Sequence, residues 1–201
     1  MNLFDDDFND DDIGDEEDFF SAASPTVAEP EGLLPPRQSN YLIGHENVEQ
    51  TLIDLINSGA MPHAVIFSGP VGIGKSTMAF RLARYLLKHG TTDSAQDSLF
   101  GDAPVAAANL NMESNDPTFS RVTSSGHPDL LTIERPMDTK KGTQKNNLDV
   151  DTARKVAPFL RMTASNGGWR VVIVDDADSM NRNAQNALLK ILEEPPKNAL
   201  L

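Results

Sequence analysis

The sequence predicts an α/β domain in which helices flank a parallel sheet, and three observations support this fold class. Short apolar runs at 64–68, 130–133 and 169–174 alternate along the chain with longer segments of helical periodicity. These runs lack alternating polar residues, as is typical of strands that are covered on both faces. At 201 residues, the chain is long enough for one such domain with its own core and a tail.

The first 37 residues are predicted to lie outside this domain, as a disordered acidic arm and a proline-rich linker. Residues 1–31 contain 12 acidic residues and no Lys or Arg, so they carry 12 of the 13 net negative charges. The other 18 acidic and 17 basic residues nearly balance, so the acidity does not exclude a nucleic-acid partner for the domain. The Leu and Phe residues of the arm leave open a second interpretation, a short motif that binds a partner protein.

Two helices with an apolar stripe are expected in the first half of the domain. The first spans 46–57 and ends at a Ser-Gly pair. Its inward face is formed by Val48, Leu52, Leu55 and Ile56. The second helix spans 77–88, with its apolar residues inward and its basic residues on the opposite side. Those basic residues are Arg81, Arg84 and Lys88.

The second half of the domain is less regular. Residues 91–125 are rich in Ser, Asp, Asn and Ala and lack strong periodicity, which predicts a polar surface insertion. A polar basic loop is expected over 137–147. Segment 151–164 has helical spacing, but Pro158 removes a backbone donor and should kink or divide that helix. A last helix is expected over 183–194 and is ended by two prolines.

A glycine-rich motif connects the first apolar run to the second helix. Residues 69–76 match the phosphate-binding pattern G-x-x-x-x-G-K-[ST], in which backbone N–H groups surround a phosphate, Lys75 reaches the β- and γ-oxygens and Ser76 ligates Mg²⁺. The alternative, a glycine-rich turn that binds nothing, is disfavoured by the strand and helix expected on either side. The sequence therefore predicts a nucleoside triphosphate site. Its cofactor-binding residues are Gly69, Pro70, Val71, Gly72, Ile73, Gly74, Lys75, Ser76 and Thr77.

An acidic pair follows the third apolar run. Asp175 and Asp176 lie at the carboxyl end of that strand, the edge at which open α/β sheets bind ligands, so Lys75 and Asp175 should converge. Asp175 is the candidate Mg²⁺ ligand, directly or through water, and Asp176 is the candidate catalytic residue that orients an attacking water. ATPases of this kind more often have Glu in place of Asp176, and the shorter side chain favours nucleotide binding over hydrolysis. A turn or helix cap is the alternative interpretation of this pair.

Four segments together resemble the AAA+ core of the clamp-loader subunits of bacterial DNA polymerase III, and among these the delta-prime subunits most closely. They are 43–46 (Ile-Gly-His-Glu), 62–69, 126–130 and 186–196. The resemblance covers 38–201 and identifies this part as a P-loop NTPase domain of the AAA+ type, incomplete at its C-terminus. The sensor, arginine, lid and collar elements would follow residue 201, so the chain is expected to be a fragment.

The resemblance implies a role in DNA replication. It implies an ATP-binding subunit of a hetero-oligomeric loader, which contacts the sliding clamp and primed DNA through the assembled complex. The holoenzyme is a nucleotidyltransferase, but such a subunit has no polymerase active site and weak or no ATPase activity of its own. Many relatives carry a four-cysteine zinc module at the position of 91–125. This chain contains no cysteine, so the expected cofactors are ATP and Mg²⁺ without zinc.

Two other functions fit the same motifs. A stand-alone AAA+ ATPase, such as a helicase loader or remodelling motor, would use Asp176 as a competent catalytic group. A small-molecule kinase would need a lid bearing several arginines, and the candidates are scattered along the chain. They are Arg135, Arg154, Arg161 and Arg170.

Two remaining features concern DNA and membranes. Lys140, Lys141 and Lys145 in the basic loop could contact DNA phosphates, although three lysines in a polar loop more often form only a solvated surface. The chain has no signal-like leader and no apolar run of about 18 residues, so a cytoplasmic protein without a membrane partner is expected.

Overall fold

The computed structural model describes residues 33–90, 106–138, 142–145, 147–165 and 168–201. The predicted acidic arm up to residue 32 lies outside these ranges, as do Lys140 and Lys141. All elements named below belong to the unit Leu34–Leu201. In chain order they are α1 (Glu46–Asn57), α2 (Lys75–His89), α3 (Pro117–Thr123), β1 (Leu130–Ile133), β2 (Met137–Asp138), β3 (Thr143–Gln144), α4 (Val150–Ala153), α5 (Val156–Arg161), β4 (Arg170–Val174), the 3₁₀ helix η2 (Ala177–Ser179), α6 (Arg182–Glu193) and β5 (Ala199–Leu200).

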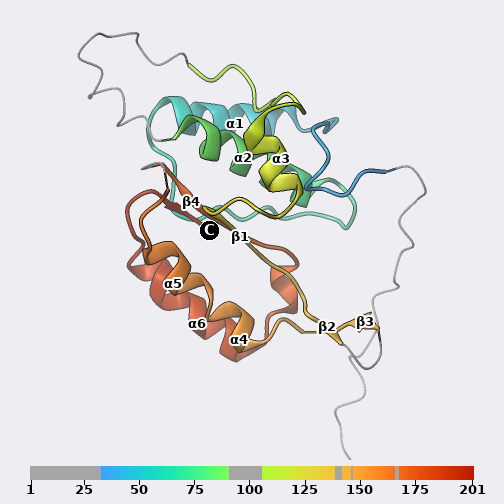
Figure 1. The fold of residues 1–201 in the computed structure, drawn as a ribbon, viewed down its shortest axis with the longest axis vertical. Coiled ribbons are helices and arrows are strands. Elements are labelled where there is room, and N and C mark those ends of the chain that lie inside the picture. Colours follow the sequence, from blue (N-terminus) through green and yellow to red (C-terminus); the bar gives the residue numbers. More distant parts are fainter. Residues whose placement is uncertain (1–32, 91–105, 139–141, 146, 166–167) are drawn as a thin grey trace, which may run out of the picture. The chain divides into compact units, whose positions relative to one another are not determined.

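The described unit contains a parallel sheet with the strand order β1-β4-β5. Figure 1 shows α1, α2 and α3 on one side of this sheet and α4, α5 and α6 on the other. Side chains of β4 alternate between the two layers, because Val171 and Ile173 pack with the first helical group while Val172 and Val174 pack with the second. A strand covered on both faces has no polar face, which explains its continuous apolar run. The predicted α/β fold is confirmed.

The first predicted strand, 64–68, is not formed as expected. The N–H of Val65 donates to the carbonyl of Leu201 at 2.9 Å, and the N–H of Leu201 donates to the carbonyl of His63 at 2.9 Å. These two bonds continue the parallel sheet beyond β5 for a single residue pair. Nothing in the described chain pairs with residues 66–68, and Ile66 is 91% exposed. The structure assigns no strand to 64–68, and the pairing of this segment with the chain after β5 is described only as far as Leu201.

The first helix, α1, has the predicted bounds but a different inward face. Leu52 and Ile53 are buried, whereas Val48 is 41% exposed. Glu49, one residue further along the helix, takes the inward place because it accepts two hydrogen bonds from the guanidinium of Arg81, at 2.7 and 2.9 Å. The apolar stripe alone therefore misplaced Val48.

The second helix, α2, confirms the predicted helix but not its outward basic face. Arg81 is 3% exposed and Arg84 is wholly buried. Arg84 donates to two backbone carbonyls and lies over the ring of Phe119, 4.7 Å from its centroid. Burial, together with the nearby charge of Arg81, lowers the pKa of Arg84 to about 10. These arginines are inside because other segments supply acceptors for them.

The segment predicted as a polar surface insertion is only partly described, and its described part belongs to the core. Leu110, Phe119 and Val122 are buried and line the same side of the sheet as α1 and α2. The helix α3 starts where Asp116 accepts a hydrogen bond from the N–H of Thr118 at 2.7 Å, with a proline at its first position. The prediction was wrong for 106–123, because five buried apolar residues anchor this segment: Ala107, Leu110, Met112, Phe119 and Val122.

The predicted division of the helix over 151–164 is confirmed. It forms α4 and α5, and the break falls at Arg154 and Lys155. The ring of Pro158 would clash with the carbonyl four residues earlier, which is that of Arg154, so the break lies where the proline requires it. The expected basic loop over 137–147 contains a small antiparallel hairpin, formed by β2 and β3.

Candidate nucleotide-binding site

The glycine-rich loop leads directly into α2. Gly74 is the residue before this helix and has a φ of 98°. A Cβ atom at this position would lie 2.3 Å from Cδ1 of Leu42. Glycine is therefore needed here both for the left-handed backbone and for the close approach of a neighbouring side chain. Residues 69–72 are exposed and residues 73–77 are half-buried, so the outer part of the predicted phosphate loop faces solvent.

Lys75 lies back over this loop. Its Nζ donates to the carbonyl oxygens of Gly69 at 2.9 Å and of Pro70 at 2.8 Å. Both acceptors belong to the loop itself, so the ammonium group is held at its mouth rather than in a salt bridge. A lysine ammonium has three hydrogens, and a third remains to donate to an incoming oxygen atom.

Ser76 and Asp175 are distant in the sequence but in contact in the structure. The Ser76 hydroxyl donates to Oδ1 of Asp175 at 2.8 Å, across 99 residues of sequence. Ser76 lies in the first turn of α2, and Asp175 directly follows β4, where its N–H donates to the carbonyl of Ile133 on β1 at 2.9 Å. The two side chains predicted as metal ligands therefore form one oxygen-rich pair.

Asp176 is also at this edge of the sheet, but its carboxylate is engaged elsewhere. Its backbone is left-handed, with a φ of 61°, and its Oδ2 lies 3.0 Å from Nε of Arg135. Arg135 follows β1, the neighbouring strand. From the sequence it is a candidate only for the lid of a kinase. The structure instead pairs it with the predicted catalytic carboxylate.

The kinase hypothesis gains no support from the described arginines. Arg154 pairs with Asp151 on α4, and Arg170 is buried beside Asp129. Arg135 pairs with Asp176, so these three arginines belong to three separate ion pairs and do not form one lid.

Two residues before α1 also contact the loop, and the sequence singled out only one of them, His45, as part of a resemblance. Nε2 of His45 lies 2.7 Å from the carbonyl oxygen of Ile73, and Leu42 packs against Gly74 as described above. No local pattern could have indicated these contacts, because His45 is 28 residues from its acceptor.

Ser76 and Asp175 could supply two of the ligands of a magnesium ion. Across the described ranges, no group of three or more His, Asp or Glu side chains could hold a metal ion. Ser76 and Asp175 supply a hydroxyl and a carboxylate, which are hard oxygen ligands. Mg²⁺ commonly takes one or two protein ligands and completes its shell with water and phosphate oxygens, so this pair suits a nucleotide-bound ion. No helix in the described part is long and apolar enough to cross a membrane.

Comparison with known proteins places this chain in a family. The model of the family described as DNA polymerase III, delta subunit, matches residues 44–201. The chain is 34% identical over 139 residues to DNA polymerase III subunit delta' of Pseudomonas aeruginosa, covering 69% of this chain and 36% of that protein.

Two further relatives come from other subunits. The chain is 26% identical to the probable replication factor C subunit 5 of Caenorhabditis elegans, over 81% of this chain and 35% of that protein. It is 27% identical to DNA polymerase III subunit tau of Escherichia coli, over 81% of this chain and 22% of that protein. The chain thus spans about a third of these relatives or less. The chain belongs to the DNA polymerase III delta subunit family, and the resemblance to the clamp-loader delta-prime subunits is confirmed.

Proposed function

We propose that this chain is part of a clamp-loader subunit that binds ATP and Mg²⁺ through residues 69–77 and helps to load a sliding clamp onto primed DNA. The relatives support the replication role, because they are subunits of DNA polymerase III and of replication factor C by name. One observation supports the nucleotide site above all, the 2.8 Å hydrogen bond between Ser76 and Asp175. It joins the phosphate loop to the acidic strand end.

The proposed roles follow from the positions of the side chains. Ser76 and Asp175 would hold Mg²⁺, and Lys75 would exchange its two loop carbonyls for phosphate oxygens. The backbone N–H groups of the loop and of the first turn of α2 would receive the remaining phosphate charge. When bound, Mg²⁺ would offset the negative charge of the phosphate groups.

Weak or absent hydrolysis by the chain alone is the second part of the proposal. A carboxylate that orients water must face the nucleotide, whereas Asp176 is paired with Arg135 at 3.0 Å. Release of that pair would be required before Asp176 could act. This arrangement disfavours the alternative of a stand-alone AAA+ ATPase, in which Asp176 would be ready for catalysis.

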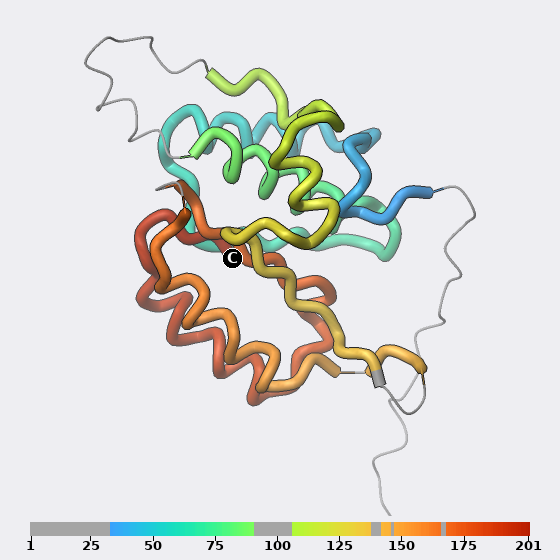
Figure 2. Tube along the Cα trace, viewed as in Figure 1, coloured from blue at the N-terminus to red at the C-terminus, as the bar shows by residue number. Residues whose placement is uncertain are grey.

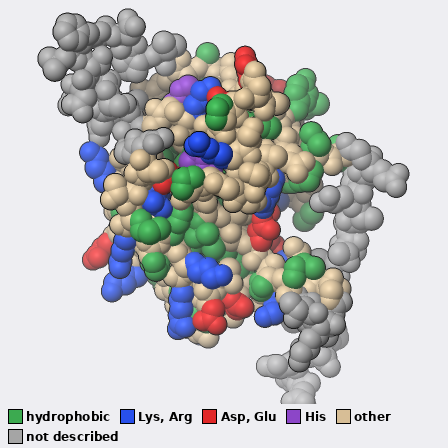
Figure 3. Space-filling view, viewed as in Figure 1, with side chains coloured by type: hydrophobic (Ala, Val, Ile, Leu, Met, Phe, Trp, Pro, Cys, Tyr) green, Lys and Arg blue, Asp and Glu red, His purple; other side chains and the backbone are tan. Residues whose placement is uncertain are grey.

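The proposed partners are other loader subunits, with the clamp and primed DNA bound by the assembled complex. Exposed basic residues are present on α5 and α6, namely Arg161, Arg182 and Lys190. Figure 3 shows Lys and Arg side chains mixed with Asp and Glu on the face of the molecule that it draws. Lys145 itself lies 3.8 Å from Asp149. The carboxylate of Asp149 thus offsets part of the charge that Lys145 could present to DNA.

Nucleotide binding can be tested by titrating the full chain with a fluorescent ATP analogue in Mg²⁺. We expect saturable binding that Lys75→Ala weakens about tenfold or more, because a charge-assisted hydrogen bond is lost. Lys190→Ala, a change of an exposed lysine on α6, serves as the control and should bind like the wild type. A folded wild-type chain that does not bind would refute the nucleotide site.

Hydrolysis is tested separately by measuring phosphate release. Little or no turnover is expected from the chain alone, and Arg135→Ala should raise turnover if the ion pair restrains Asp176. Steady turnover by the wild type that Asp176→Ala abolishes would instead favour a stand-alone ATPase.

DNA contact requires the assembled loader. Replacing Lys140, Lys141 and Lys145 together by Ala should weaken binding to primed DNA and reduce its salt dependence. An unchanged salt slope would remove the basic loop from the proposal.

A further inference from the structure

The segment before α1 is fixed along the outside of α2. Residues 37–45, called the strap below, run beside the segment 112–125, as Figure 2 shows. The buried Arg84 donates from Nη1 to the carbonyl of Arg37 at 3.0 Å and from Nη2 to the carbonyl of Ser39 at 2.7 Å. An arginine fork that binds two carbonyls fixes the direction of the backbone between them.

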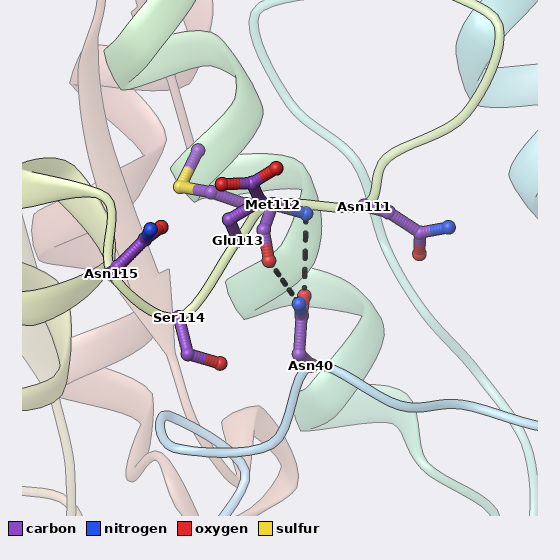
Figure 4. A pocket seen from close by; sticks show the side chains of 6 residues that line it. All are labelled: Asn40, Asn111, Met112, Glu113, Ser114 and Asn115. Atoms are coloured by element: carbon purple, nitrogen blue, oxygen red, sulfur yellow. Dashed lines mark hydrogen bonds between the residues drawn. The ribbon is translucent and has the colours of Figure 1, made fainter.

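A second anchor lies one residue further along the strap. The side-chain amide of Asn40 donates to the carbonyl of Met112, and the N–H of Met112 donates to Oδ1 of Asn40 at 3.4 Å. Figure 4 shows this pairing at the edge of an open cavity of about 580 Å³. Both ends of the amide are used, so Asn40 holds the strap as a neighbouring strand would. The strap therefore reaches the phosphate loop from a fixed position.

The far end of the strap touches the loop at two adjacent residues. Leu42 covers Gly74, and Nε2 of His45 lies 2.7 Å from the carbonyl oxygen of Ile73. His45 is half-buried and immediately precedes α1, and its own carbonyl accepts the N–H of Glu49 at 2.9 Å. The backbone of His45 is thus fixed at the start of α1, and its imidazole is half-buried.

The contact defines where the proton of His45 must be. A carbonyl oxygen only accepts, so Nε2 has to carry the hydrogen of this bond. In the neutral imidazole the other nitrogen, Nδ1, is then unprotonated. This tautomer can be measured independently of any nucleotide.

The peptide between Ile73 and Gly74 transmits the contact to the loop. Peptide units are planar and trans, so the carbonyl of Ile73 and the N–H of Gly74 point in opposite directions. Holding the carbonyl toward His45 therefore turns the N–H of Gly74 away from the strap. Gly74, with a φ of 98°, has conformational freedom that this bond and the contact with Leu42 remove.

We propose that His45 is a positioning residue for the phosphate loop, donating from Nε2 to the carbonyl of Ile73 and thereby aiming the N–H of Gly74 at a bound phosphate. This inference rests on the proposed nucleotide site. Preorganised N–H donors bind an anion without the cost of reorienting the backbone, so loss of the contact weakens binding without removing any group that touches the nucleotide.

The experiment compares three replacements of His45 with the fluorescent ATP analogue in Mg²⁺. His45→Phe and His45→Ala remove the donor and should weaken binding about five- to tenfold, the size expected for one hydrogen bond. His45→Gln keeps an N–H donor at a similar reach and should bind within about twofold of the wild type. His63→Phe alters an exposed histidine away from the loop and is the matched control.

A spectroscopic measurement accompanies the titration. In the ¹⁵N spectrum of the wild-type chain without nucleotide, the His45 signals, assigned by their loss in His45→Gln, should show a protonated Nε2 and an unprotonated Nδ1 above the titration range of the ring. Circular dichroism of each variant establishes that it is folded. The tautomer keeps the proposal testable even if His45→Phe fails to fold.

The outcomes are distinct. Binding by His45→Phe equal to that of the wild type, or weakening by His45→Gln as large as by His45→Phe, overturns the positioning role. A proton on Nδ1 in the wild type overturns it as well. If the wild type does not bind while Nε2 is protonated, the nucleotide site itself is refuted and the positioning role falls with it.

Discussion

The two sides of the sheet are stabilised by different kinds of contact. On the side of α4, α5 and α6, the buried layer between the helices and β4 is apolar, with Val156, Leu188 and Ile191 at most 4% exposed, and its charged pair Arg170–Asp129 lies at the amino end of the strand. On the side of α1, α2 and α3, the buried layer includes Arg81 and Arg84 within the helix that carries the phosphate loop.

Apolar packing and arginine hydrogen bonds constrain the structure to different degrees. Apolar packing tolerates repacking at modest cost, whereas an arginine that donates to fixed acceptors permits one geometry. Arg84 holds the strap, and Arg81 binds Glu49 and Asn111. The other side has one such arginine, Arg170, which donates to the carbonyls of Phe159 and Thr163 near the amino end of β4. The side that supports the loop has two, both within the helix that carries the loop. We expect it to be more sensitive to small chemical changes.

The largest expected effect comes from breaking the ion pair on the loop side. Glu49→Gln should lower the free energy of unfolding by about 3–5 kcal/mol, because it leaves the charge of Arg81 buried without its partner. Urea denaturation measures this loss. Glu113→Gln, at an exposed position, should change stability by less than about 0.5 kcal/mol. Equal effects in both variants would abolish the contrast between the two sides.

The next largest effect concerns the apolar side. Leu188→Ala on α6 should cost about 3 kcal/mol, because Leu188 is 4% exposed and its removal leaves a cavity. Leu189→Ala, whose side chain is 51% exposed, is the neighbouring control and should cost much less. Binding of the ATP analogue to the folded Leu188→Ala chain should be unchanged. Weaker binding would mean that the apolar side also positions the loop.

A smaller effect is expected at the contact between strap and loop. Gly74→Ala should cost about 1–3 kcal/mol and weaken analogue binding, because the new Cβ meets both a φ of 98° and the side chain of Leu42. Gly44→Ala has a similar φ, 83°, but open space around the Cβ. Thermal denaturation of the two variants should therefore separate backbone strain from the clash. Identical losses would argue against a tight contact with Leu42.

The last effect is the pH dependence of the same ion pair. Burial alone would raise the pKa of Glu49, but hydrogen bonds from Arg81 and from the N–H of Leu110 leave this pKa below its ordinary value. A carboxylate with a lowered pKa contributes stability above the pKa of its unfolded state, and this stability is lost as the pH falls through the folded-state pKa. The difference between the denaturation midpoints of the wild type and Glu49→Gln should therefore shrink as the pH falls through this lowered pKa. A constant difference down to acid unfolding would contradict the assignment.

Local sequence patterns predicted the elements whose stability depends on their own periodicity. The bounds of α1, β1 and β4 follow from apolar spacing within each segment, and Pro158 correctly indicated a divided helix. Lys75 and Asp175 were expected to converge at one edge of the parallel sheet, and the structure pairs Asp175 with the adjacent Ser76. Ligand binding by these residues remains a prediction.

Several features could not be read in this way. The environments of Arg81 and Asp176 are set by Glu49 and Arg135, which lie 32 and 41 residues away in the sequence. In each case the deciding partner came from a different part of the chain.

The sequence by itself determined the layered α/β arrangement and the positions of the loop and acidic residues, because hydrophobic periodicity and glycine spacing are local properties. Only the tertiary structure decided which polar side chains are buried, which carboxylate is paired and which residues support the loop. The physical reason is that a charge can leave water only when a specific partner replaces its hydration, and that partner is identified by proximity in space and not in sequence.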